Sequence, residues 1–448
     1  MNRSLGWIRG PGSVWAAVLF LGLAAAEAQP ETNRPVSAGS VEGAPGSLSL
    51  ADAQRIAVQR NWDLLAAAAG VDAAMAQKIV AREFPNPTLA ASSSKIKVDN
   101  QPSSTSEGNG VWDRSYDTIF AINQLFEIGG KRSSRKASAQ AGFEGAKAQF
   151  FDAKRTLDLA ITKAYVAAAQ AEESVRVLKQ SAATLRKEAQ LAEIRRKAGE
   201  ISDSDEKQIQ ITAEKFELDA SAAESTAAQA RVALEVLLAV RHPKGGVTLS
   251  DRLETLGAER LPTEANHLGL GRPDVMAAEA ALKKAEADLR LQKANRIPDP
   301  TLLAQYEHEP PDARNTAGLG VSLPLPLWNR NRGNILAAEA AREQTRLAFE
   351  KIQTQAAADI ATARFAYDDA LKRWQSYRDS IRPKSEQIRQ TIAYAYAKGG
   401  ASLLDLLVAE RNDNDVRLAA AQAAGDTAVA VAALKAATLV IQPSQITK

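Results

Sequence analysis

The chain of 448 residues contains no cysteine, only three histidines and only three methionines. Disulfide bonds, thiolate chemistry and a lipid anchor on an N-terminal cysteine are therefore excluded. His242, His267 and His308 lie far apart in the sequence, and soft metal ions prefer cysteine and methionine ligands. We therefore expect no metal site, no cofactor and no catalytic residue.

Aromatic residues are also few, at 5%, although hydrophobic residues reach 45% and alanine is abundant. This mixture favours helices that pack closely through small side chains over a large aromatic core. The 56 basic and 53 acidic residues nearly cancel and are interspersed along the chain. Because nucleic-acid-binding proteins present clustered basic residues, no nucleic-acid partner is expected.

No stretch of about 18 or more apolar residues follows the N-terminal segment, so no transmembrane helix is predicted. The N-terminal segment itself has the pattern of a secretory signal. Arg3 and Arg9 precede an apolar run at residues 14–23, and a small-residue Ala-x-Ala site follows. A membrane anchor is the alternative, but the run is too short to span a bilayer comfortably. We expect a signal peptide over residues 1–28 and an extended leader over 29–47.

Two motifs occur twice, which indicates an internal duplication. Pro-Asn-Pro-Thr-Leu at residues 85–89 returns as Pro-Asp-Pro-Thr-Leu at 298–302, and the segment 199–205 returns 200 residues later at 399–405. Each half then has the same order of parts: a helix, two strands, a very long helix, a turn and a helix back. The predicted divisions are a first repeat at 48–240, a connector at 241–271, a second repeat at 272–440 and a tail at 441–448.

The helices are predicted from apolar periodicity and from proline and glycine punctuation. The expected ranges are 48–82, 131–197, from the turn at Gly199 to about 240, 273–295, 331–398 and 402–440. The helix at 131–197 would be about 100 Å long at 1.5 Å per residue. Apolar residues spaced alternately by four and three predict that it packs as a coiled coil. This seam comprises Leu157, Ile161, Ala164, Ala168, Ala171, Val175, Leu178, Ala182, Leu185, Ala189 and Ala192.

The second long helix carries a similar seam. It comprises Ile360, Ala363, Tyr367, Ala370, Trp374, Tyr377 and Ile381. Pro383 follows this seam, and it predicts an interruption because proline lacks an N–H and its ring clashes with the preceding turn.

Four strands are predicted, at 88–98, 116–126, 301–307 and 316–327. The fourth alternates apolar residues with glycine and polar residues, which is typical of a barrel strand with one face in lipid. Its predicted lipid-facing residues are Leu319, Val321, Leu323, Leu325 and Trp328. A half-buried strand of a soluble protein is the alternative. Four strands cannot close a barrel and lipid forbids an open edge, so two, three or more copies would have to share one.

The sequence resembles the TolC-type outer-membrane factors over about residues 48–439. The likeness depends on the duplicated architecture and on two motifs. These are Gln-Leu-Phe-Glu-Ile-Gly-Gly-Lys-Arg at 124–132 and Leu-Pro-Leu-Pro-Leu-Trp-Asn-Arg-Asn-Arg-Gly at 323–333, which are most like the CzcC-like heavy-metal branch. The resemblance implies a mainly α protein located in the outer membrane. In it, a trimeric 12-stranded β-barrel stands above a periplasmic α-barrel of long coiled-coil helices.

The resemblance also implies functional positions at the two helical turns. A periplasmic adaptor is expected to dock on Gly199, Glu200, Ile201, Ser202, Gly399, Gly400, Ala401 and Ser402. Asp405, with Asp203 and Asp205, would lie at the periplasmic aperture, where three copies of a carboxylate attract cations. A helix-start carboxylate that complements the helix dipole is an equal alternative for Asp405. For Asp203 and Asp205, capping or solvation is the simpler interpretation.

The preferred function is a passive outer-membrane duct that works with an adaptor and an inner-membrane RND transporter, with divalent heavy-metal cations as the expected cargo. A multidrug or type I secretion duct of the same fold is one alternative. A periplasmic adaptor would need a β-domain split around a single hairpin, and the duplicated long helices disfavour it. A purely structural coiled coil does not account for the alternating strand.

Overall fold

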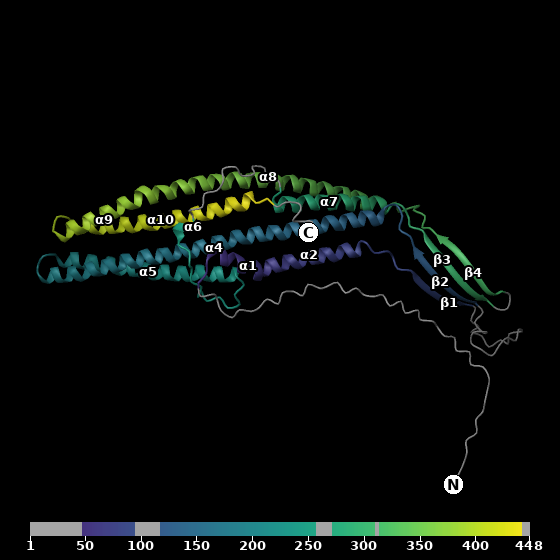
Figure 1. Ribbon diagram of the computed structural model, residues 1–448, viewed down its shortest axis with the longest axis horizontal. Coiled ribbons are helices and arrows are strands. Elements are labelled where there is room, and N and C mark those ends of the chain that lie inside the picture. Colours follow the sequence, from purple (N-terminus) through teal and green to yellow (C-terminus); the bar gives the residue numbers. More distant parts are fainter. Residues whose placement is uncertain (1–46, 95–116, 257–270, 310–312, 441–448) are drawn as a thin grey trace, which may run out of the picture. The chain divides into compact units, whose positions relative to one another are not determined.

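The computed structural model describes residues 47–94, 117–256, 271–309 and 313–440 (Figure 1). The predicted signal peptide, most of the leader, residues 257–270 of the connector and the tail lie outside them. The helices are α1 (Leu50–Arg60), α2 (Trp62–Val80), α4 (Lys131–Lys197), α5 (Asp203–Leu237), α6 (Leu253–Leu256), α7 (Pro273–Ala294), α8 (Arg332–Ser376), α9 (Arg382–Ala397) and α10 (Leu403–Thr438). The strands are β1 (Thr88–Ser94), β2 (Asp117–Leu125), β3 (Thr301–Glu309) and β4 (Ala313–Ser322).

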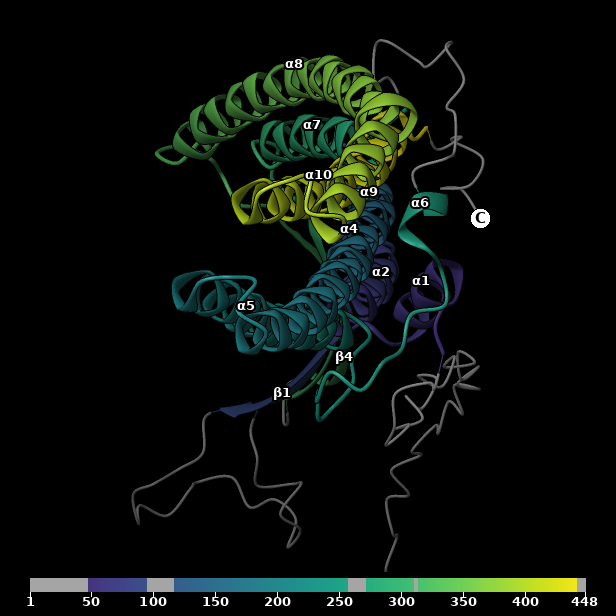
Figure 2. The same cartoon turned by 90° about the vertical axis from the view of Figure 1, so that its left-hand side faces the viewer.

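Helix α4 lies at the centre of the helical packing. It is 67 residues long and contacts α5, α7, α2 and α10, so that it touches both repeats (Figure 2). The predicted seam is confirmed, since seven of its eleven residues are buried and the others are half-buried. Ile161 and Leu185 are completely buried. None of the described helices is both long enough and apolar enough to cross a membrane.

The first predicted helix is two helices, because Asn61 interrupts it. The Asn61 side-chain oxygen accepts hydrogen bonds from the N–H groups of Asp63 and Leu64 at 3.0 and 3.2 Å, so this residue caps α2. Its amide donates to the carbonyl of Leu237 at 3.1 Å, which ties the break to the end of α5. Asparagine is a strong helix cap, and this signal inside an apolar pattern was missed.

The predicted interruption of the second long helix is confirmed. A π-helical turn, Tyr377–Ile381, separates α8 from α9, and the Arg382 N–H donates to the carbonyl of Tyr377, five residues back. In a regular helix the Pro383 ring would meet the carbonyl of Asp379. A wider π turn just before the proline accommodates the ring.

The connector is attached by two buried polar side chains that the sequence analysis did not single out. The Glu235 carboxylate accepts hydrogen bonds from four successive backbone N–H groups, residues 244–247, at 2.6–3.1 Å. The Tyr165 hydroxyl donates to the carbonyl of Leu48 at 2.8 Å, and burial raises the pKa of Tyr165 to about 12. Leu48 in turn forms a parallel bridge with Leu249. These bonds hold the connector against the start of the first repeat.

The four strands form one antiparallel sheet in the order β1-β2-β3-β4. The two predicted hairpins are therefore joined through β2 and β3, where Leu125 lies opposite Thr301. The fourth strand ends at Ser322, so its predicted extension to Leu327 is wrong. Pro324 and Pro326 lack the N–H that a continued ladder requires.

The sheet has one apolar and one mostly polar face, as the register shows. Leu319 lies opposite Ala304, which lies opposite Ile122, which lies opposite Leu89. On the other face, Gly318 lies opposite Gln305. The apolar face is exposed: Leu319 is 91% and Val321 is 70% accessible. The period-2 alternation is thus confirmed as far as Ser322.

The four junctions between strands and helices lie at one end of the sheet and are bonded to each other. The Phe126 N–H donates to the carbonyl of Pro300 at 2.9 Å. Asp299 accepts the Ile128 N–H at 2.9 Å and pairs with Lys131 at 2.7 Å. Between them Gly129 has φ +72, and a Cβ there would lie 3.0 Å from the Ile297 side chain. These bonds fix how α4 leaves the sheet.

We expect Gly129→Ala to destabilise the protein by about 1–2 kcal/mol, because a left-handed residue with a Cβ is strained and the methyl group meets Ile297. Gly142→Ala is the control, since a Cβ at Gly142 has only ordinary contacts near 3.8 Å with Lys284 and helix propensity favours alanine. Denaturant unfolding of the purified protein would measure both. Equal stability of the two variants would contradict this account of the junction.

Candidate functional site at the two helical turns

The two repeats turn at their helix ends with the same backbone geometry. Gly199 and Gly399 have φ +80 and +77. The Glu200 N–H donates to the carbonyl of Arg195 at 2.9 Å, and the Gly400 N–H donates to that of Ala395 at 2.8 Å. This is the Schellman motif, which needs a left-handed residue and so selects glycine. The predicted turn positions are therefore placed as expected.

The next helix of each repeat begins with a capping box. Ser202 and Ser402 are the N-caps, and their side chains accept the N–H groups of Asp205 and Asp405 at 3.1 and 3.2 Å. Each aspartate in return accepts the backbone N–H of its serine, at 3.4 Å in the first repeat and 3.0 Å in the second. Two orphan donors of each helix start are thus satisfied reciprocally.

The structure gives the three predicted aperture carboxylates different surroundings. Asp405 is exposed, and a hydrogen bond from the Ser402 hydroxyl at 2.7 Å holds its pKa below the usual range. Asp203 pairs with Lys207 at 2.5 Å, one helical turn away, and this hydrogen bond lowers its pKa. Asp205 is half-buried in its capping box. All three have a local structural partner.

The turns of the two repeats lie beside each other. They border a common pocket of about 450 Å³, and the Arg195 guanidinium lies 5.3 Å from the ring centroid of Tyr396. The pocket is lined by Arg195, Glu200, Ile201, Asp205, Tyr396, Ala397, Lys398, Gly399, Ala401 and Leu403. The structure therefore brings five of the eleven predicted turn and aperture residues to one surface, where polar, charged and small groups are mixed.

An ion network with two buried carboxylates, which was not predicted from the sequence, holds α9 to α10 near the second turn. Arg389 pairs with Glu410 at 3.3 Å and with Asp413 at 3.1 Å. Arg417 pairs with Asp413 at 2.8 Å. Burial raises the pKa of Glu410. The spacing of Glu410, Asp413 and Arg417 by three and four residues places them on one helix face, which was the available signal.

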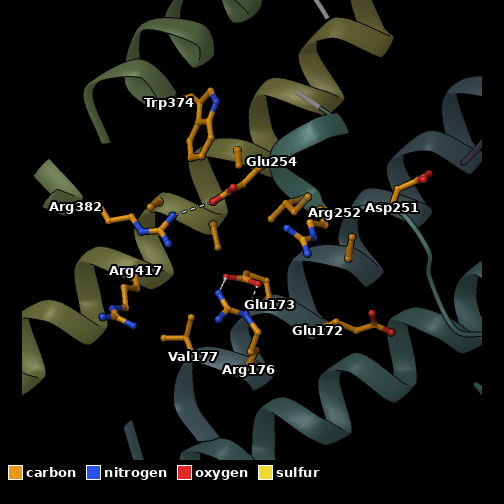
Figure 3. Close-up of a pocket in the computed structure, with 15 residues that line it drawn as sticks. Glu172, Glu173, Arg176, Val177, Asp251, Arg252, Glu254, Trp374, Arg382 and Arg417 are labelled. Carbon is orange, nitrogen blue, oxygen red and sulfur yellow. Dashed lines mark hydrogen bonds and ion pairs between the residues drawn. The ribbon is translucent and has the colours of Figure 1, made fainter. Parts of the chain in front are cut away.

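A larger pocket of about 620 Å³ lies between α4, α6, α8, α9 and α10 (Figure 3). Trp374, Val177, Leu253 and four alanines form its apolar part, and four acidic residues and four arginines form the rest. Arg382 pairs with Glu254 at 2.8 Å, and Arg176 hydrogen-bonds Glu173 at 2.8 Å. Because the opposite charges balance, this pocket does not favour either sign of ligand.

The predicted lipid-facing residues are all exposed, but only some of them lie on a strand. Leu319 and Val321 are on β4, whereas Leu323, Leu325 and Trp328 follow it. Trp328 is 94% accessible. No cluster of three or more histidine, aspartate or glutamate side chains suited to hold a metal ion occurs within the described ranges.

We expect the stabilisation of the α10 N-terminus by the Asp405 carboxylate to depend on pH. The folded pKa is depressed, so the stabilisation is complete above the ordinary aspartate pKa of about 4 and is lost as the pH falls through the lower folded value. Hydrogen exchange of residues 400–406 should be faster in Asp405→Asn than in the wild type at pH 7. The two proteins should converge once the pH has fallen below the folded pKa of Asp405. Asp203→Asn is the control and should leave this segment unchanged, and a pH-independent difference would refute the prediction.

Known proteins that are similar in sequence and in fold support this architecture. The chain matches the outer membrane efflux protein family over residues 54–240 and 266–438. It is 27% identical over 397 residues to the cobalt-zinc-cadmium resistance protein CzcC of Cupriavidus metallidurans, covering 88% of this chain and 91% of the relative. It is 25% identical to the nickel-cobalt-cadmium resistance protein NccC of Alcaligenes xylosoxydans xylosoxydans, covering 73% and 74%.

A solved structure, the outer membrane protein VceC of Vibrio cholerae, shares the fold with a TM-score of 0.70 at 21% identity. The match covers 88% of this chain and 97% of VceC. The predicted fold class, the CzcC-like resemblance and the outer-membrane location with a periplasmic helical part are confirmed. The chain belongs to the outer membrane efflux protein family.

Proposed function

We propose that this protein is the passive exit duct of a tripartite efflux pump. Three copies form one duct, a periplasmic adaptor docks at the helical turns, and an inner-membrane RND transporter supplies the energy. Divalent heavy-metal cations are the proposed cargo. The observation that carries the proposal is a sheet with two open edges and an exposed apolar face, continued by a helix of 67 residues.

The open edges support assembly. Among the described strands, β1 pairs only with β2 and β4 pairs only with β3. A lipid environment leaves no unpaired edge, because each unsatisfied backbone group costs several kcal/mol there. Three copies give 12 strands, an even number within the range of closed bacterial barrels. The strands of each copy would then continue the sheet of the next.

The faces of the sheet support its orientation. Leu89, Ile122, Leu319 and Val321 lie on the exposed apolar face. In a closed barrel this face would meet lipid, and the face that carries Gln305 would line the water-filled interior. Leu323, Leu325 and Trp328 would extend the apolar surface to the membrane boundary, where tryptophan is enriched.

The helical turns are the proposed contact with the rest of the pump. Seven of the eight docking positions are uncharged: three are glycine, two are serine, one is alanine and one is isoleucine. Glu200 is the one charged position among them. Gly199, Glu200, Gly399 and Gly400 are exposed. Such surfaces allow close approach of a partner backbone. Asp405 of each copy would contribute one carboxylate to a ring at the aperture that favours cations.

The cargo is proposed from the relatives, whose names describe resistance to cobalt, zinc, cadmium and nickel. The described residues hold no metal-binding cluster, which suits a duct through which ions pass without being held. A soft-metal relay is also disfavoured by the absence of cysteine.

Deletion of the gene is expected to lower the tolerated concentration of zinc, cobalt or cadmium several-fold in growth assays. Tolerance of dyes and antibiotics should change little. Re-expression of the wild-type chain should restore metal tolerance, and a variant with Leu319→Asp and Val321→Asp should not, since it places charges on the proposed lipid face. Sensitivity restricted to dyes or antibiotics would instead favour a multidrug duct.

The protein purified from outer membranes is expected to have three times the mass of one chain, because four strands close only in an assembly. Amine-reactive cross-linking of intact membranes should produce a ladder that ends at three chains. Light scattering in detergent measures the mass directly. A monomer in the soluble fraction would exclude the duct.

A further inference from the structure

We infer that the four strand–helix junctions form a basic collar that binds the phosphate of anionic phospholipids. The collar consists of residues 78–84, 127–136, 290–300 and 328–332. This inference rests on the proposed membrane position of the sheet. It assigns a ligand class to a surface on the helix side of the sheet, away from the helical turns.

Charge distinguishes the collar from the rest of the chain. It contains eleven basic and three acidic residues, a net charge of +8, whereas the whole chain has +3. The basic residues are Lys78, Arg82, Lys131, Arg132, Arg135, Lys136, Arg290, Lys293, Arg296, Arg330 and Arg332. These residues are dispersed in the sequence, and the fold brings them to one end of the sheet.

The strand register places the four segments at one end of the sheet. Leu125, at the end of β2, lies opposite Thr301, at the start of β3, and Thr301 lies opposite Ser322, at the end of β4. Thr88, at the start of β1, lies opposite Asn123. Each collar segment precedes or follows one of these strand ends by a few residues. The four segments therefore lie near the same end of the sheet.

Several collar contacts serve to build the junction, and these use two of the three acidic residues. Asp299 pairs with Lys131 at 2.7 Å, and Glu127 pairs with Arg135 at 2.6 Å. Arg132 donates to the carbonyl of Arg82 at 2.6 Å. Glu83, which is exposed, is the one remaining acidic residue of the collar.

Six basic side chains of the collar are exposed and have neither an ion pair nor a side-chain hydrogen bond to any described residue. They are Arg82, Lys136, Arg290, Arg296, Arg330 and Arg332. Guanidinium groups bind phosphate oxygens through paired N–H donors. Uncompensated basic groups next to a membrane surface attract anionic lipid.

Apolar side chains beside these groups favour a lipid over a free anion. Phe84 is 69% and Trp328 is 94% accessible. The Arg132 guanidinium lies 3.9 Å from the Phe84 ring centroid, and Trp328 is two residues from Arg330. An aromatic ring at the level of the head groups beside a basic group is typical of a membrane interface. The occupant is therefore proposed to be an anionic phospholipid such as phosphatidylglycerol.

The test compares lipid binding by three full-length proteins in detergent, using native mass spectrometry with added phosphatidylglycerol or phosphatidylcholine. The collar variant combines Arg82→Gln, Arg296→Gln, Arg330→Gln and Arg332→Gln. None of these four side chains holds the junction. The control variant removes the same charge from exposed positions on other helices, with Lys187→Gln, Lys215→Gln, Lys384→Gln and Arg411→Gln.

Wild type and control are expected to prefer phosphatidylglycerol about tenfold or more, and 0.5 M salt should weaken this preference because ions screen exposed charges. The collar variant should bind both lipids alike. Equal binding of the two lipids by the wild type, or an unchanged preference in the collar variant, would overturn the inference. If those proteins still form trimers in outer membranes, the proposed duct stands without the collar, whereas a soluble monomer would exclude both.

Discussion

The buried seam of α4 is the constraint on which the rest of this structure depends. A helix of 67 residues with an alanine-rich apolar stripe cannot stay exposed to water along its length. Here Leu178, Ala182 and Leu185 of that stripe pack against α5, and α4 also contacts α7, α2 and α10. Because α10 belongs to the second repeat, this packing also joins the two halves. Without the second repeat, α4 would lose its contacts with α7 and α10.

The start of α4 connects the packed helices to the sheet. Gly129 and Gly130 adopt left-handed backbone and turn the chain from β2 into the helix, and Asn331 does the same after β4. Asp299 then ties the first junction to the second repeat through Ile128 and Lys131. These bonds therefore fix the strand ends relative to the packed helices. The same arrangement gathers the basic residues that the sequence disperses.

The sequence predicted most of this because its strongest signals are local and repeated. Heptad spacing predicted the packing of α4, Pro383 predicted the interruption after α8, and glycine residues predicted both turns. Several polar contacts were missed, although some of them had a local signal in the sequence. Glu235 caps a loop nine to twelve residues away, Asn61 divides an apolar helix, and Arg389 joins two helices through Glu410 and Asp413. The capping tendency of Asn61 and the spacing of Glu410 and Asp413 could be read from the sequence, but the partners of these residues and of Glu235 are defined only by the fold.

The duplication also bears on how Asp405 acts, since the repeats agree in backbone but differ in charge. Asp203 and its lysine partner stand at the first turn, while Leu403 and the exposed Leu404 stand at the second. Asp405 is therefore the nearest carboxylate to the second turn on α10. Its Oδ2 atom accepts both bonds from Ser402, and its Oδ1 atom has no hydrogen bond to the described residues. One oxygen therefore caps the helix, while the other would be able to interact with a cation at the proposed aperture. Capping and a role at the aperture are thus compatible, and the cap would hold the carboxylate in place as ions pass.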